Sequence, residues 1–233
     1  MSDFLVTFDV FSALIDSRTG GSAYFADRAV SYGGWAVTGQ RVYDDWDAQN
    51  KRLHAQIRRW RPFAEIAEIA LASVYLDLGI ASDVTADCRG LLASMTQWPL
   101  WPDVTKEALI KIGHPLGLLS NIDDALLTGT APLGLGCFDP DLVLTSQRLQ
   151  SYKPAAEFYL RAAAEVGPLL HVASSARDIR GSLESGLTCV RLARPGHRVD
   201  PEGSSPLMEV AGVSGLPAAL ASFAKLGVGP PKV

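Results

Sequence analysis

Short apolar runs, typical of buried strands, recur along the chain and are separated by amphipathic stretches. The clearest runs are residues 4–10, 115–120, 142–145, 169–173 and 188–192, with a weaker one at 207–213. Between them lie stretches with helical periodicity at about 103–112, 154–166 and 176–185, and a last one begins near 216. Strands that alternate with helices predict a parallel sheet with helices on both faces. We therefore expect an α/β protein with a Rossmann-like, doubly wound sheet.

The interval 16–99 interrupts this alternation. Residues 40–60 are rich in Trp, Arg, Asp and Gln, and residues 63–78 repeat Ala, Ile and Leu at helical spacing. We predict that 16–99 forms a helical cap inserted after the first strand, and that 1–15 and 100–233 form the α/β core. Trp35, Trp46 and Trp60 lie in the predicted cap and suit either helix packing or the lining of a pocket.

Composition and charge exclude several classes of function. Of 233 residues, 48% are hydrophobic and 20% charged, which indicates a folded protein, and the net charge of −4 disfavours nucleic-acid binding. No apolar run is long enough to span a membrane, and Asp3 and Asp9 lie where a signal peptide would be apolar. Three scattered cysteines favour a reducing compartment. We expect a cytoplasmic protein with a small-molecule substrate.

Polar residues follow successive predicted strands. They are Asp9, Ser120 with Asn121, Lys153 on a following loop, and Ser174 with Ser175 and Asp178. Each alone also suits a turn or a helix cap, but ligands of open parallel sheets bind at the carboxyl ends of the strands. A strand-end carboxylate can act as a nucleophile that forms an ester. A lysine about 4 Å away would stabilise its ionised form by about 4 kcal/mol at an effective dielectric of 20.

These residues stand in four segments that resemble the motifs of the haloacid dehalogenase superfamily. The segments are FDVFSALID from Phe8, LLSN from Leu118, YKP from Tyr152 and HVASSARD from His171. Their order and the length of the predicted cap also resemble that superfamily. Most members are magnesium-dependent phosphatases with a second aspartate two residues after the nucleophile, where this chain has Phe11. Ala173 likewise replaces an acidic residue of the fourth motif. These two replacements make the chain more similar to the L-2-haloacid dehalogenases, which use no metal, and Tyr159 matches a tyrosine of that group.

The resemblance implies roles for individual residues. Asp9 would attack the carbon that carries the halogen, and water would then hydrolyse the aspartyl ester, without a cofactor or metal. The catalytic residues would be Asp9, Lys153, Asp178 and Ser175. The substrate-binding residues would be Phe11, Ser12, Ser120, Asn121, Ser174 and Tyr159, and the halide would meet Asn121 and Arg41, with Arg52 as a second candidate. The resemblance also makes a homodimer plausible, and His171 is expected to be a core histidine.

Several positions depart from the dehalogenase pattern. Ser12-Ala13 replaces the usual Gly-Thr, Ser175 replaces an asparagine, and Asp47 follows Trp46 where an arginine is usual. Three alternatives to a 2-haloacid dehalogenase therefore stay open. They are a hydrolase for another small carboxylate, a phosphatase that uses Mg²⁺, and a binding module without activity.

Overall fold

The core of the protein is a six-stranded parallel sheet, seen in a computed structural model that describes residues 4–226. The strand order is β3-β2-β1-β4-β5-β6. The bounds are β1 (Leu5–Phe8), β2 (Leu116–Ser120), β3 (Val143–Thr145), β4 (Leu169–Ala173), β5 (Thr188–Leu192) and β6 (Met208–Val210). The order reverses between β1 and β4, where an open α/β sheet places its ligand site. The sheet predicted from the apolar runs is confirmed.

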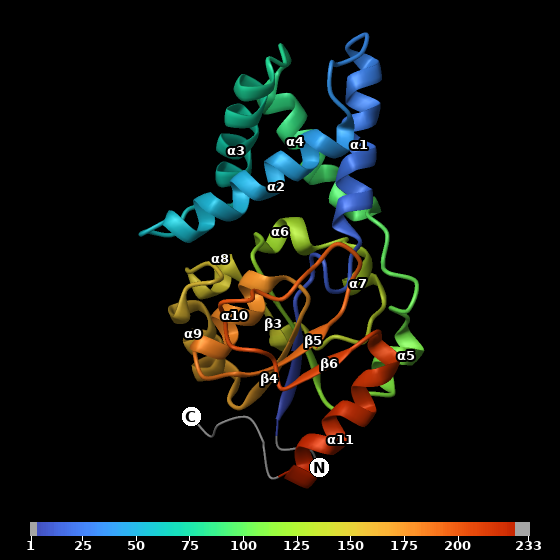
Figure 1. The fold of residues 1–233 in the computed structure, drawn as a ribbon, viewed down its shortest axis with the longest axis vertical. Coiled ribbons are helices and arrows are strands. Elements are labelled where there is room, and N and C mark those ends of the chain that lie inside the picture. The colour runs from blue at the N-terminus through green and yellow to red at the C-terminus, as the bar shows by residue number, and fades with distance from the viewer. Residues whose placement is uncertain (1–3, 227–233) are drawn as a thin grey trace.

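Helices cover both faces of this sheet. In Figure 1, α9 (Ala156–Val166) and α10 (Ala176–Glu184) lie on one side, and α5 (Lys106–Ile110) and α11 (Leu216–Leu226) lie on the other. Three helical turns of four residues each complete the core, and they had no counterpart among the predicted helices: α6 (Asp124–Leu127), α7 (Ala131–Gly134) and α8 (Ser146–Leu149). Single 3-10 turns occur at η2 (Pro140–Leu142) and η3 (Val213–Gly215).

Alternate residues of the strands pack on opposite faces, as the two-residue period of a strand requires. Val6 and Phe8 belong to one apolar cluster, which also contains side chains of α5 and α11. Leu5 belongs to a second cluster, built with Phe158 and Ala162 of α9. Because both faces are apolar, the polar residues of the strands are confined to a few positions and to the strand ends.

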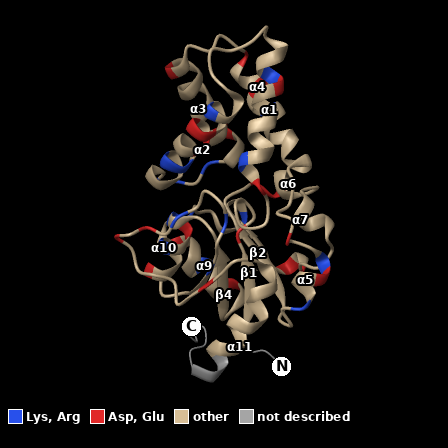
Figure 2. Ribbon diagram, turned by 45° about the vertical axis from the view of Figure 1, so that its right-hand side comes forward, with Lys and Arg blue, Asp and Glu red and all other residues tan. Residues whose placement is uncertain are grey.

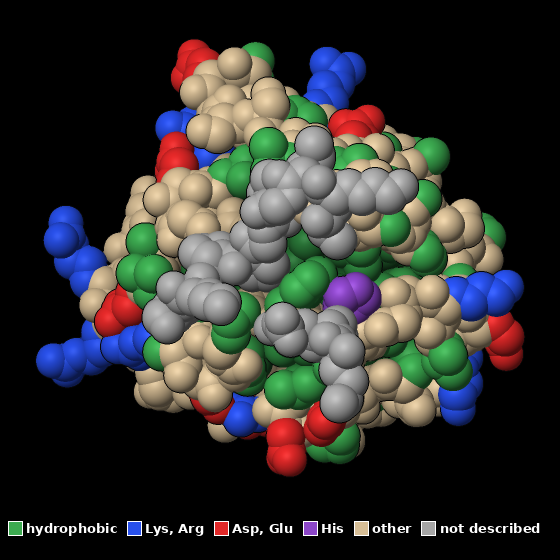
Figure 3. Space-filling view, turned by 90° about the horizontal axis from the view of Figure 1, so that it is seen from below, with side chains coloured by type: hydrophobic (Ala, Val, Ile, Leu, Met, Phe, Trp, Pro, Cys, Tyr) green, Lys and Arg blue, Asp and Glu red, His purple; other side chains and the backbone are tan. Residues whose placement is uncertain are grey.

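Four helices and one 3-10 turn occupy the interval between β1 and α5. They are α1 (Ser17–Ser31), α2 (Gly39–Gln56), α3 (Phe63–Leu78), α4 (Val84–Ser94) and η1 (Met95–Gln97). In Figure 1 they stand above the end of the sheet at which β1 finishes. No helix of the described residues is long and apolar enough to cross a membrane. Figure 3 shows the opposite end of the molecule, where apolar side chains gather and charged ones lie mostly at the rim.

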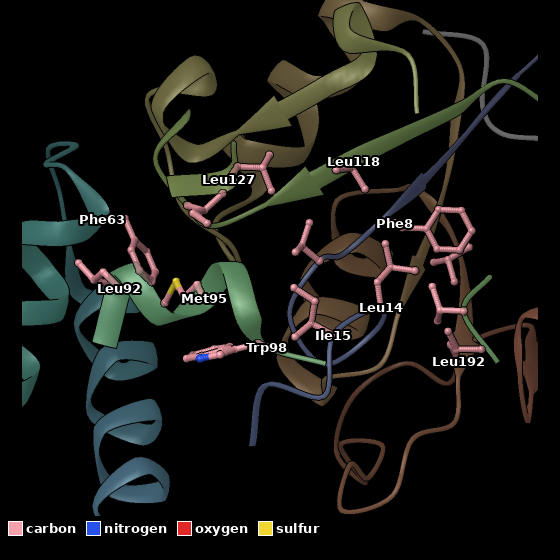
Figure 4. Packing of buried hydrophobic residues seen from close by; sticks show 14 of the residues in the cluster. Phe8, Leu14, Ile15, Phe63, Leu92, Met95, Trp98, Leu118, Leu127 and Leu192 are labelled. Atoms are coloured by element: carbon pink, nitrogen blue, oxygen red, sulfur yellow. The ribbon is translucent and has the colours of Figure 1, made fainter. Parts of the chain in front are cut away.

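Two chain segments join the cap to the core side by side. Asp16 N–H donates to Pro99 O at 2.8 Å, and Trp101 N–H donates to Leu14 O at 3.0 Å. Figure 4 shows the apolar packing through this junction, with Met95 and Trp98 between cap and core. One apolar cluster therefore continues from the sheet into the cap.

A second junction ties the start of α3 to the core. Both carboxylate oxygens of Asp123, which follows β2, accept hydrogen bonds from the α3 backbone, one from Phe63 N at 2.8 Å and one from Ala64 N at 3.0 Å. Tyr152 Oη donates to Arg61 O at 2.8 Å in the loop before α3. Since a helix N-terminus has unpaired N–H groups and a positive dipole end, Asp123 suits this position electrostatically.

Candidate active site

Asp9 lies at the centre of the sheet, directly after β1. Its backbone N–H donates to Val172 O of β4 at 3.0 Å, so the register of these two strands fixes its position. The residue is 8% exposed. One carboxylate oxygen, Oδ1, is 3.0 Å from Lys153 Nζ, whereas Oδ2 has no hydrogen-bond partner among the described residues. Asp9 thus has one oxygen held by a cation and one oxygen free to react.

Lys153 joins the two carboxylates of the site. Its Nζ donates to Asp9 Oδ1 and, at 2.6 Å, to Asp178 Oδ2. The Asn121 side chain holds the Lys153 backbone from both sides, because Oδ1 accepts from Lys153 N at 2.8 Å and Nδ2 donates to Lys153 O at 3.1 Å. The loop also approaches α10 closely: a Cβ at Gly181 would lie 2.8 Å from Pro154 O. Only glycine fits there without moving the loop.

Asp178 is held in the first turn of α10, after β4. The N-terminal Ser175 hydroxyl accepts from the Asp178 backbone N–H at 3.4 Å. Tyr159 Oη of α9 donates to Asp178 Oδ1 at 2.8 Å, while Lys153 occupies Oδ2. Both carboxylate oxygens of Asp178 therefore have partners within the protein, whereas Asp9 has a partner at Oδ1 alone among the described residues.

His171 adds a fourth ionisable group to this network. Thr7 Oγ1 donates to Leu170 O at 3.3 Å and can therefore accept from His171 Nδ1 at 3.0 Å. The other ring nitrogen, Nε2, faces Asp178 Oδ2 at 3.1 Å. Nε2 also lies 3.4 Å from Lys153 Nζ. His171 is buried in a strand as the sequence suggested, but it also contacts an ionised carboxylate of the site.

The surroundings shift the pKa values of Asp9 and Asp178 in opposite directions. Burial raises the pKa of Asp9, although the charge of Lys153 opposes part of this effect. Burial also acts to raise the pKa of Asp178, but Lys153 and His171 outweigh it and hold that pKa below its usual range. Two carboxylates whose environments separate their pKa values are suited to different chemical roles.

The carboxylates open into a cavity of about 650 Å³ between the core and the cap. It is bounded on the cap side by α2 residues and by Trp98, and on the core side by residues that follow β1, β2, β4 and β5. Figure 2 shows positions of both charge signs in cap and core, and nine charged residues line this cavity: Asp9, Asp16, Arg18, Asp44, Asp47, Lys51, Lys153, Arg177 and Asp178. A cavity of this volume and mixed polarity is typical of small-molecule sites.

The turn after Asp9 has an unusual backbone. Ser12 has a φ of 65°, in the left-handed region that favours glycine. Trp101 Nε1 donates to Ser12 O at 3.0 Å and holds this conformation. Phe11 packs edge-to-face on Trp98, with ring centroids 5.9 Å apart. The turn thus directs Phe11 and Ser12 to the cavity and keeps the backbone next to Asp9 in place.

Comparisons with known proteins identify the fold. The chain matches the L-2-haloacid dehalogenase of Xanthobacter autotrophicus, solved with chloropropionic acid covalently bound, at a TM-score of 0.80 and 20% identity, over 94% of this chain and 98% of that one. The haloacid dehalogenase fold is the fold of this chain. A defluorinating L-2-haloacid dehalogenase (TM-score 0.76, 24% identity, 94% and 95% coverage) and the 2-haloacid dehalogenase of Pseudomonas syringae pv. Tomato (0.60, 22%, 94% and 99%) also match. No family model and no curated protein sequence matches.

The haloacid dehalogenase fold predicted from the four motifs is therefore confirmed, and most of the predicted site residues meet in its cavity. Those that line it are Asp9, Phe11, Ser12, Ser120, Asn121, Lys153, Ser175 and Asp178. Ser120 is fully buried and its hydroxyl has no hydrogen-bond partner among the described residues. Asn121 retains one N–H, because only one is used on Lys153 O.

Four predicted residues do not line the cavity. Ser174 is fully buried and donates to Leu192 O at 2.7 Å. Tyr159 lies behind Asp178 and positions that carboxylate. Arg41, the halide candidate on α2, has a 62% exposed side chain and pairs with Asp45 at 2.6 Å. Arg52, the second halide candidate, is also exposed and away from the cavity. On a helix, residues 41 and 45 share a face that differs from the face of 43, 46, 47, 50 and 54, which lines the cavity.

The sequence did not single out several residues of the cavity: Asn50, His54, Trp98, Trp101, Arg177 and Pro195 to His197. Trp46 lines it, whereas Trp35 and Trp60 do not. Trp46, Asn50 and His54 are four residues apart on one helix, so they share a face. This spacing would have predicted Asn50 and His54 once Trp46 was known to face the cavity. Arg177 directly precedes Asp178, but a surface arginine in the first turn of a helix gives the same pattern.

The residues around Asp9 do not fit the magnesium site of the superfamily's phosphatases. Magnesium prefers several oxygen ligands, mostly carboxylates. Here Phe11 and Ala173 replace two acidic positions, and Lys153 Nζ lies against both carboxylates that remain. Among the described residues, no group of three His, Cys, Asp or Glu side chains suits a metal ion.

Proposed function

We propose that the protein is a hydrolase that removes halide from a small 2-haloacid through an ester on Asp9. The observation that carries this proposal is the asymmetry of the Asp9 carboxylate: Lys153 holds Oδ1, whereas Oδ2 has no hydrogen-bond partner among the described residues, in a residue that lines the cavity. A nucleophile must be ionised and accessible. Burial raises the pKa of Asp9, the charge of Lys153 acts against that effect and favours the ionised form, and the cavity gives a ligand access to the residue.

In the first step, Asp9 Oδ2 attacks the carbon that bears the halogen. A carbon–oxygen bond forms, the carbon–halogen bond breaks, and the halide leaves with the electron pair. Ser120 and the backbone amides after Asp9 are suited to bind the carboxylate of the substrate, and the remaining N–H of Asn121 is suited to the halide.

In the second step, water attacks the carbonyl carbon of the aspartyl ester. The products are a 2-hydroxyacid, a proton and the restored Asp9 carboxylate. Asp178 lines the cavity and keeps a low pKa, so it remains ionised and can orient this water. Lys153 pairs with both carboxylates before the first step and keeps its pair with Asp178 while Asp9 is esterified.

The structural neighbours support this proposal. The Xanthobacter enzyme was solved with chloropropionic acid covalently bound, and this supports a covalent step on a 2-haloacid in a protein of the same fold. The acidic residues of a magnesium phosphatase are replaced here, and so we expect turnover that is independent of divalent metal.

The test is halide release from 2-chloropropionate in the presence of EDTA, followed by a single turnover in water labelled with oxygen-18. We expect halide release, and we expect mass spectrometry to locate the label in Asp9, because water attacks the aspartyl carbonyl. Asp9→Asn should abolish release, whereas the matched variant Asp141→Asn, at an exposed position away from the cavity, should retain it.

Other outcomes would identify an alternative. Phosphate-ester hydrolysis that requires added magnesium would contradict the proposal and favour a phosphatase. An ester on Asp9 with other carboxylic substrates, but no halide release from any haloacid, would favour a different small-carboxylate hydrolase. Ligand binding without any adduct would favour a binding module.

A further inference from the structure

The cap side of the cavity holds two enclosed polar atoms that the proposed reaction does not use. Asn50 Oδ1 and His54 Nε2 have no hydrogen-bond partner among the described residues, and both residues are 5% exposed. They are one turn apart on α2, so both lie on the helix face that lines the cavity. Leaving a buried polar group unpaired is unfavourable, which suggests that a ligand completes these groups.

Arg177 lines the same cavity from the first turn of α10. The other cavity cations all pair with carboxylates: Arg18 with Asp44, Lys51 with Asp47, and Lys153 with Asp9 and Asp178. Arg177 has neither a hydrogen bond nor an ion pair with any described residue, although it is partly buried. Its guanidinium is therefore available to an anion.

The charge of Arg177 acts on His54, and both residues line the cavity. Burial, followed by the positive charge of Arg177, lowers the pKa of His54 to about 3, so this imidazole stays neutral. Burial also lowers the pKa of Arg177, although not enough to remove its charge. One permanent cation and one neutral hydrogen-bonding ring thus line the same cavity as the amide of Asn50.

Resting on the proposed function, we propose that Arg177, His54 and Asn50 bind a second carboxylate of the substrate. The preferred substrates are then dicarboxylic acids with a halogen at carbon 2, of the 2-chlorosuccinate type. The guanidinium fork matches a carboxylate, neutral His54 donates one N–H, and Asn50 donates another after a half-turn of its amide.

The charges and size of the cavity favour this class of ligand. Asp44 and Asp47 also line it, and they disfavour a doubly charged phosphate more than a singly charged carboxylate. A three-carbon haloacid fills only a small part of about 650 Å³, which is room for roughly twenty waters at their share of liquid volume. Ser120 and the turn after Asp9 remain free to bind the first carboxylate.

The test compares acids with one and two carboxylates. Calorimetry should show that the intact protein binds succinate at least tenfold more tightly than propionate. Arg177→Gln should weaken the binding of succinate by about tenfold to a hundredfold, as expected for a charged hydrogen-bonded pair. The affinity for propionate should stay unchanged. Arg180→Gln is the matched control, because this arginine lies on the same helix, pairs with Glu184 and Asp200, and is away from the cavity. It should retain the preference.

Halide release from 2-chlorosuccinate and 2-chloropropionate separates this inference from the proposed function. Equal binding of succinate and propionate, or an equal loss of both in Arg177→Gln, would overturn the second carboxylate site even if halide is released. An Arg177-dependent preference for succinate would support the site even if neither acid releases halide, and the dehalogenation proposal would then fail alone.

Discussion

The core and cap sides of the cavity differ in how their polar groups are satisfied. On the core side, Asp178, Lys153 and Tyr159 bind one another, while Asp9 Oδ2, the Ser120 hydroxyl and Arg177 have no partner among the described residues. On the cap side, Asn50 Oδ1 and His54 Nε2 also have none within that part of the chain. The ionic network around Lys153 is therefore organised before any ligand arrives, whereas the two cap groups keep hydrogen-bonding capacity for one. The proposed reaction uses the core side, and the proposed second carboxylate site joins two cap residues to Arg177 of the core.

The largest effect that tests this difference is expected at Lys153. Lys153→Met leaves two buried carboxylates facing each other, and breaking a buried pair of this kind costs about 3–5 kcal/mol of unfolding free energy. We expect halide release to fall by roughly a thousandfold or more, as for other residues that act as a unit. Urea unfolding and halide release measure the two effects. Near-normal stability in this variant would contradict the organised core side.

Tyr159→Phe tests the same network more mildly. It removes one hydrogen bond to the ionised Asp178, which is worth about 1.5–3 kcal/mol when the acceptor is charged. Because the pKa of Asp178 is depressed in the folded state, this contribution is present above the unfolded pKa near 4 and is lost as the pH falls below it. The stability gap between wild type and variant, measured by urea unfolding, should therefore narrow in acid. A gap that is independent of pH would mean that Tyr159 contributes only packing.

The sequence predicted the core side better than the cap side, for a physical reason. Asp9, Lys153 and Asp178 follow strands, and a parallel sheet brings the ends of its strands together whatever the details of packing. No comparable rule fixes which face of α2 turns inward. The sequence therefore predicts Arg41 as the cap residue of the site, whereas Asn50 and His54 line the cavity. His171 was assigned to the core, since a strand pattern shows burial but not the carboxylate that approaches from the next helix.

His54→Phe tests the cap side, where removal of a polar group should not destabilise the protein. His54 stacks on Tyr152 with ring centroids 4.3 Å apart. Phenylalanine would keep this stacking and eliminate Nε2, which has no partner among the described residues. The folded pKa of His54 is lowered to about 3, so the unfolded chain binds the proton first and stability falls as the pH drops below about 6.5. The variant should lose this part of the acid sensitivity, by urea unfolding at pH 7 and pH 4. An unchanged pH dependence would show that His54 is not desolvated.

The smallest effect is expected at Ser12, where the backbone beside Asp9 is strained. A serine at φ 65° costs about 1–2 kcal/mol, and glycine relieves this cost but loses about 0.5–1 kcal/mol in chain entropy. We therefore expect Ser12→Gly to raise the unfolding free energy by about 0.5 kcal/mol. Ser12→Ala is the matched control, because it removes the same hydroxyl and keeps the strain, and it should show no gain. Equal stability of the two variants would mean that the hydroxyl, and not the backbone, sets the energy of this turn. A gain in Ser12→Gly alone would show that the core side tolerates strain in the segment that presents the nucleophile, while the cap side tolerates unpaired polar atoms.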